Sequence, residues 1–217
     1  MASSVMDNAS PTYCEASTGW LLEPINTLTN IGFFITAWLL WRHYKRTGDG
    51  ALPNDIRLLV LLIVGVGFGS TAWHATQEGW GLFLDSLFIQ LFMLTYLVSY
   101  LRRYTEWSLP ARIASMVLFM GACIASPSLW PWDFAHASAG YIPALLLLCV
   151  FALHQHRILR FKAAGYLGIA TGVFALSLSL RTADTEVCAY IPMGLHFMWH
   201  ILNAIVLYYS VRGLFKR

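Results

Sequence analysis

Long runs of apolar residues constrain this chain more than any other feature of its sequence. Seven runs of about 17 to 23 residues follow one another, and each is long enough to cross the hydrocarbon core of a bilayer as a helix. They span roughly 26–44, 56–74, 82–101, 110–126, 137–153, 163–180 and 190–211. Because these runs use most of the 217 residues, the sequence predicts an all-α seven-helix bundle that forms one integral membrane domain over residues 1–217.

The composition supports a membrane protein. Hydrophobic residues make up 58% of the chain and charged residues only 12%, which is far from the composition of an ordinary soluble domain. The polar N-terminus has no basic segment followed by a short apolar core, so we expect no cleaved signal peptide. The modest net charge of +3 gives no reason to expect a nucleic-acid partner.

The basic residues fall on one side of the predicted membrane. Thirteen of the 14 Lys and Arg residues lie in the first, third and fifth loops or in the C-terminal tail, and only Arg181 lies on the opposite side. The positive-inside rule therefore predicts an outer N-terminus and a cytosolic C-terminus.

Five polar residues stand out within the apolar runs. Ser70 and His74 are four residues apart, as are His196 and His200, so each pair shares one face of a helix. Asp85 lies near the start of the run that follows His74. With the predicted orientation, all five residues fall in the outer half of the membrane. Because polar groups are costly there, they are candidates for a functional site.

Three neutral imidazoles with one open coordination position are typical of a catalytic zinc site. We therefore predict that His74, His196 and His200 bind one zinc ion, which lowers the pKa of a bound water. Asp85 is suited to orient or deprotonate this water. Ser70 is suited to donate a hydrogen bond to the water or to the developing oxyanion. The alternative is that the histidines are satisfied by backbone carbonyls or by one another.

The segment before the first run carries polar residues at helical spacing. Glu23, Asn26 and Asn30 are three and four residues apart, which places them on one face of a helix that begins near Pro24. Proline is favourable in a first helical turn, because its missing N–H has no partner there. A functional face and a polar cap at the membrane surface explain this pattern equally well.

Two of the four cysteines fall on the outer side. Cys14 lies in the N-terminal segment and Cys188 in the last outer loop, whereas Cys123 and Cys149 lie inside predicted spans. Outer compartments permit disulfides, so a Cys14–Cys188 bridge would join the N-terminus to the last outer loop. Two free thiols are the alternative.

The order and spacing of these motifs resemble the alkaline ceramidases, which belong to a seven-helix superfamily with the progestin and adiponectin receptors. The matching positions are Tyr13 to Glu15, Glu23 to Asn30, Ser70 to His74, Asp85, Asp184 to Cys188, and His196 to His200. The resemblance implies a zinc-dependent amidase acting on ceramide-like membrane lipids. It also implies that the three histidines are the zinc ligands and that Ser70 and Asp85 lie beside the metal.

The N-terminal motif departs from the family pattern. Family members resemble DWCExN at a position where acidic and amide groups help to hold calcium, and this chain has TYCEA there. Calcium takes about six to eight oxygen ligands, and Glu15 and Glu23 alone are too few. We therefore expect no calcium site.

Two functions from different classes are consistent with the sequence. The first is a hydrolase of an amide or ester bond in a membrane lipid, and the second is a seven-helix, receptor-like protein with a structural zinc. Structural zinc usually has four protein ligands, so an open position near Asp85 favours the hydrolase. The sequence does not distinguish among three substrates: ceramide, another N-acyl lipid and an ester lipid.

Overall fold

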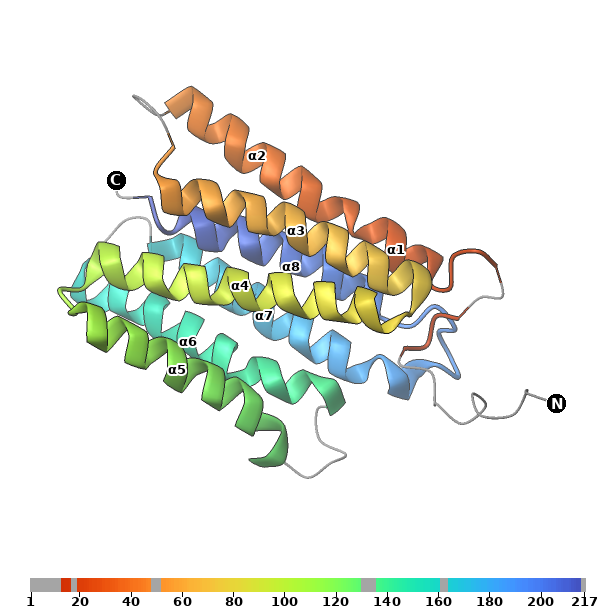
Figure 1. Ribbon diagram of the computed structural model, residues 1–217. Helices are drawn as coiled ribbons and strands as arrows, with labels where there is room; N and C mark the ends of the chain where they lie inside the picture. Colours follow the sequence, from red (N-terminus) through yellow and green to blue (C-terminus); the bar gives the residue numbers. More distant parts are fainter. Residues whose placement is uncertain (1–12, 17–18, 48–51, 130–135, 161–163, 216–217) are drawn as a thin grey trace.

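The computed structural model describes residues 13–16, 19–47, 52–129, 136–160 and 164–215. Within these ranges the secondary structure is entirely helical, without strands. The long helices run side by side as one bundle (Figure 1). The predicted all-α helical bundle is therefore confirmed for the described residues.

The described residues form seven long helical segments in chain order. The first segment is interrupted, because α1 (Pro24–Thr29) and α2 (Ile31–Thr47) are separated by Asn30 alone. The others are α3 (Asn54–Thr76), α4 (Gly79–Tyr104), α5 (Leu109–Ala125), α6 (Ile142–Leu153), α7 (Ala164–Ala183) and α8 (His196–Arg212). Short 3₁₀ or π turns stand between or beside them: η1 (Ser126–Leu129), η2 (His136–Tyr141), η3 (His154–Ile158) and η4 (Thr185–Val187).

Most of the predicted helix limits lie within a few residues of these bounds. The predicted run 137–153 begins as the 3₁₀ turn η2 and becomes α-helical only at Ile142. Residue 163, the predicted start of the sixth helix, lies outside the described residues.

The last helix begins later than predicted, because α8 starts at His196 rather than at residue 190. Residues 190–195 form turns, and Gly194 has a φ of 64°, in the left-handed region that glycine tolerates. The carboxylate of Asp184 accepts hydrogen bonds from the backbone N–H groups of Leu195 (2.5 Å) and His196 (2.8 Å). Since the first N–H groups of a helix have no partner within it, Asp184 stabilises this start.

Among the described residues, five helical segments are long and apolar enough to cross a membrane. They are Asn54–Thr76, Gly79–Tyr104, Leu109–Leu129, Ser138–Ile158 and Gly165–Ala183. Large apolar side chains also cover the outside of the bundle; on α5, for example, Val117, Leu118 and Ile124 are 67–74% exposed. An apolar surface of this kind suits contact with lipid. These features fit a multi-pass membrane protein.

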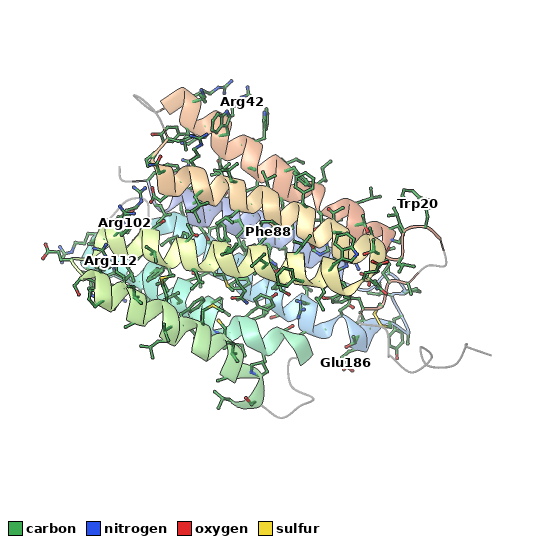
Figure 2. All side chains as sticks on the ribbon, viewed as in Figure 1. Trp20, Arg42, Phe88, Arg102, Arg112 and Glu186 are labelled. Atoms are coloured by element: carbon green, nitrogen blue, oxygen red, sulfur yellow. A yellow bond between two sulfur atoms is a disulfide. The ribbon has the colours of Figure 1, made fainter. Side chains whose placement is uncertain are left out.

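Charged and interfacial side chains lie at the two ends of the bundle. Arg42, Arg102 and Arg112 lie towards the end where α2 finishes, and Trp20 and Glu186 lie at the opposite end (Figure 2). The long sides of the bundle between these ends are therefore the surface available to lipid tails.

Helix α3 is the most buried of the five candidate spans, and it packs closely against α4. A Cβ atom on Gly69 would lie 2.7 Å from the carbonyl carbon of Leu84 and 2.8 Å from the backbone nitrogen of Asp85. A Cβ atom on Gly81 would lie 2.9 Å from the Cα of Trp73. Glycines at both positions allow the two backbones to touch, and this close crossing brings Ser70 to Asp85.

Candidate metal centre

The three predicted zinc ligands lie together at one end of the bundle. His74 comes from the last turns of α3, and His196 and His200 come from the first turns of α8. One ring nitrogen from each histidine can be chosen so that all three lie within 4.8 Å of one another. All three side chains are buried. The structure therefore brings these residues together as a group that can hold a metal ion.

Two of the imidazoles present the same nitrogen to a common point. Nδ1 of His74 lies 2.5 Å from Oε2 of Glu23, and Nδ1 of His200 lies 3.0 Å from the hydroxyl of Thr29. The opposite nitrogens, Nε2 of His74 and Nε2 of His200, are 3.1 Å apart. Two nitrogens bound tetrahedrally to one zinc at about 2.0–2.1 Å would lie roughly 3.3 Å apart. The spacing of these two nitrogens therefore suits two ligands of one metal ion, and it is also within hydrogen-bond distance.

The third imidazole leaves a nitrogen without a protein partner. Nδ1 of His196 is buried and has no hydrogen-bond partner among the described residues. Buried polar atoms are normally paired, so this orphaned nitrogen is a second observation that fits a metal ion.

Glu23 contacts one of the three histidines directly, a role that the sequence did not reveal. Its carboxylate contacts Nδ1 of His74, accepts a hydrogen bond from Nδ2 of Asn26 (2.8 Å) and accepts another from Nε2 of Gln77. Burial raises the pKa of the Glu23 carboxyl to about 7, against the lowering effect of the Asn26 and Gln77 hydrogen bonds. A carboxylate behind a histidine is the usual arrangement that orients a metal-binding imidazole.

The polar residues of the first helix are not a surface cap. Glu23, Asn26 and Asn30 are each completely buried, so the interpretation of this pattern as a polar cap at the membrane surface is wrong. The helical spacing of these three residues was the sequence signal for Glu23, because it marked a polar face that turns into the bundle.

Ser70 and Asp85 meet at the close crossing of α3 and α4. The hydroxyl of Ser70 hydrogen-bonds to the carboxylate of Asp85. Oδ1 of Asp85 is buried and has no hydrogen-bond partner among the described residues. Ser70 lies one helical turn before His74, so the carboxylate is held in the layer of the bundle that contains the histidines. One carboxylate oxygen is left able to accept a proton.

The N-terminal segment covers the histidines from outside the helices. The ring of Tyr13 stacks on His196 with a centroid distance of 3.6 Å and lies 5.4 Å from the ring of His74. Burial raises the pKa of the Tyr13 phenol, against the lowering effect of Arg181. The phenol therefore stays neutral and able to donate a hydrogen bond.

A disulfide fixes this segment in place. Cys14 and Cys188 are bonded, with an S–S distance of 2.01 Å, which confirms the bridge and excludes two free thiols at these positions. The backbone N–H of Cys14 also donates to Oδ2 of Asp184 (3.0 Å). Because Asp184 caps α8 at His196 as well, one carboxylate links the N-terminal segment to the helix that carries two of the histidines.

The other carboxylate of the N-terminal motif is used within the protein. Oε1 of Glu15 accepts a hydrogen bond from the backbone N–H of Ile25 (2.7 Å), and Oε2 accepts one from Asn26 (2.8 Å). Glu15 therefore caps the start of α1, where backbone N–H groups lack helical partners. The two carboxylates considered for calcium, Glu15 and Glu23, thus have separate roles in the fold.

An apolar cavity lies inside the bundle, and one of its lining residues, Phe33, contacts His200, with ring centroids 6.5 Å apart. Its empty space is about 790 Å³, part of it open to the outside. Phe33, Tyr141 and Trp199 line it at the histidine end, and Tyr96 and Ser210 line it further along the helices. An apolar pocket with few polar groups suits a lipid chain.

A family model described as Ceramidase matches residues 8–214, which is nearly the whole chain. A search of curated proteins finds no matching protein. The matched range contains every residue of the metal centre, and the family supports a ceramide-hydrolysing function with a membrane lipid as substrate. By this match, together with its helical bundle and buried histidine cluster, the chain belongs to the ceramidase family.

Proposed function

We propose that this protein is a zinc-dependent hydrolase that cleaves the amide bond of ceramide-like N-acyl lipids within the membrane. Its products are a fatty acid and a sphingoid-type base. The observation that carries the zinc assignment is the arrangement of His74 and His200, whose Nδ1 atoms contact Glu23 and Thr29 while their Nε2 atoms face each other. Orientation of both rings towards one point is what a bound metal requires.

His74, His196 and His200 hold the ion in this proposal. Zinc in such a site supplies a Lewis acid that polarises the amide carbonyl and acidifies water. Asp85 accepts the proton of the attacking water and then delivers it to the departing amine. The lone buried Oδ1 of Asp85 is the atom suited to hold that proton.

Ser70 orients Asp85 in this proposal, which is supported by the hydrogen bond of its hydroxyl to that carboxylate. Donation to the oxyanion, the role expected from the sequence, requires the Ser70 hydroxyl to rotate away from Asp85 during the reaction. The acyl chain lies in the apolar cavity, whose histidine end is lined by Tyr141 and Trp199.

A receptor-like protein with a structural zinc is the second candidate, and the donor set argues against it. Structural zinc sites usually have four protein ligands. Among the described residues, the only cluster of at least three candidate ligands is His74, His196 and His200. The nearby Glu23 carboxylate contacts Nδ1 of His74. A three-ligand site leaves a position for water or substrate, as hydrolysis requires.

The decisive experiment is a hydrolysis assay on purified protein in detergent. Wild-type protein should release fatty acid from ceramide, and a chelator should abolish the release. Asp85→Asn should slow hydrolysis roughly 10²- to 10⁴-fold through loss of the general base. Ser70→Ala should slow it roughly 10²-fold through misplacement of Asp85. Both variants should retain the zinc content of the wild type, as measured by elemental analysis.

The controls are matched in chemistry. Glu106→Gln changes an exposed carboxylate and Ser179→Ala an exposed hydroxyl, so neither should affect hydrolysis. Release that survives the chelator, or full activity in Asp85→Asn, contradicts the mechanism. Hydrolysis of ester analogues without hydrolysis of ceramide would retain the mechanism and change the substrate to an ester lipid.

A further inference from the structure

Arg181 is a cation held by aromatic rings near the metal centre. Its guanidinium carbon lies 5.2 Å from the ring centroid of Trp199, 5.4 Å from that of Tyr141 and 6.0 Å from that of Tyr13. It donates hydrogen bonds to the hydroxyls of Ser138 (2.9 Å) and Tyr13 (3.4 Å). All of these partners are neutral, so they orient the guanidinium without neutralising its charge.

No carboxylate neutralises Arg181 within the described residues. The ion pair found there is Arg103–Asp55, and the Glu23 carboxylate is taken up by its hydrogen bond to His74. Nε of Arg181 is buried without a hydrogen-bond partner. The carboxylate of Asp85 interacts with the guanidinium electrostatically but forms no ion pair with it. A partly buried charge without a counter-ion is unfavourable. A guanidinium has several parallel donors, and carboxylates are among the anions that it binds best.

Arg212 shows that aromatic packing alone does not define a binding site. It packs on the rings of Tyr166 and Tyr208, and its Nε is also buried without a partner. Arg212 lies at the end of α8, far along the helix from His196. Neither arginine lines the apolar cavity itself, but two of the rings that pack on Arg181 do, whereas Tyr166 and Tyr208 do not. What distinguishes Arg181 is therefore its position.

The position of Arg181 joins the metal centre to the apolar cavity. Tyr13, which accepts a hydrogen bond from Arg181, stacks on the ring of His196 in the metal centre, with ring centroids 3.6 Å apart. Tyr141 and Trp199, which pack on the guanidinium, also line the cavity. An anion bound to Arg181 can therefore carry an apolar chain that lies in the cavity.

We propose that Arg181, assisted by the Tyr13 hydroxyl, binds the carboxylate of a long-chain fatty acid whose chain occupies the apolar cavity. The source of this ligand rests on the proposed function, because hydrolysis of an N-acyl lipid leaves the acyl chain as a carboxylate in the cavity. Arg181 then retains the acid product after the amine has left. Free fatty acid consequently competes with the lipid substrate for the cavity.

The test is binding of oleate and of oleyl alcohol to the purified full-length protein in detergent, at a pH where the fatty acid is ionised. The two ligands share a chain and differ in the head group. Wild-type protein should bind oleate roughly 10- to 100-fold more tightly than the alcohol, as expected for a charge-assisted hydrogen bond. Arg181→Gln and Arg181→Met should lose most of this preference, and Arg212→Gln should keep it.

Two variants at position 181 guard against misfolding, since methionine retains apolar contact with the rings that surround Arg181. A variant counts only if it elutes as a single species and retains a cooperative thermal unfolding transition. A folded variant that keeps the full preference for oleate overturns the proposal, because a metal-bound carboxylate would then explain it. Tighter competition by oleyl phosphate than by oleate overturns the assignment to a carboxylate.

This outcome is separable from the proposed function. If oleate binding depends on Arg181 but the protein hydrolyses no ceramide, the carboxylate site is supported and the proposed hydrolase activity is refuted. If the protein hydrolyses ceramide but its preference for oleate does not depend on Arg181, only the proposed carboxylate site is refuted.

Discussion

At the scale of single residues, Glu23 connects the fold to the metal centre. It stands at the start of α1, is completely buried, and contacts His74 on α3. Glu23 also has Asn26 and Gln77 as hydrogen-bond donors, so its carboxylate is held from both sides. A histidine that donates its second nitrogen to a fixed carboxylate has one ring orientation and one tautomer. The orientation of the His74 ring therefore depends on Glu23 and its two hydrogen-bond donors, Asn26 and Gln77, as well as on the histidine itself.

Replacement of Glu23 by Gln should weaken zinc binding while the bundle stays folded. The amide keeps the size of the side chain but replaces one acceptor oxygen by a donor, so it cannot accept from His74, Asn26 and Gln77 together. Loss of such a partner typically costs about 10- to 100-fold in metal affinity. Competition with a chromogenic chelator measures this change. Glu106→Gln, on an exposed loop, is the matched control and should bind zinc as the wild type does. Equal affinity in the two variants would show that Glu23 does not orient the ligand.

At the scale of elements, the crossing of α3 and α4 sets the position of the Ser70–Asp85 pair. The backbones touch at Gly69, next to Ser70 on α3 and opposite Asp85 on α4. Helices in a membrane gain their packing energy from this kind of close contact between small residues. The site therefore depends on a residue that carries no functional group.

Gly69→Ala should separate the two helices and damage the site. The new Cβ would stand 2.7–2.8 Å from backbone atoms of Leu84 and Asp85, and backbone atoms cannot rotate away as a side chain can. We expect a loss of roughly 1–3 kcal/mol in stability, measured as a lower thermal unfolding temperature in detergent, together with reduced ceramide hydrolysis. Gly121→Ala on α5 adds the same group where no atom lies within 4 Å. A loss of the same size in both variants would contradict the close-contact argument.

The elements and the site differ in how far the sequence predicts them. Helices such as α3 and α4 follow from apolar runs, and the pairs Ser70–His74 and His196–His200 follow from helical spacing, because both are local patterns. The late start of α8 depends on a tertiary contact, since Asp184 fixes that start from another element. The contact between Glu23 and His74 joins residues 51 positions apart, so no local pattern can reveal it.

At the scale of the whole molecule, the bundle has two chemically different ends. Arg42, Arg102 and Arg112 lie towards one end, and Glu186 and Trp20 lie at the other (Figure 2). The histidines occupy the end of α3 and the beginning of α8, and the Cys14–Cys188 disulfide closes the same region. Disulfides persist in oxidising compartments. The bridge and the distribution of basic residues thus support the same orientation by independent physical arguments.

We predict that the metal centre faces the outer, non-cytosolic half of the bilayer. The positive-inside rule places the basic end of the bundle in the cytosol, and the C-terminal tail belongs to that end in the sequence. A reporter fused after Arg217 should therefore score as cytosolic, and one inserted within residues 130–135 should score as external. A reporter fused after Arg217 that scores as external would place the disulfide in the reducing cytosol, where such bridges are rare, and would move the site to the cytosolic leaflet. With the predicted orientation, the enzyme draws its lipid substrate from the outer leaflet.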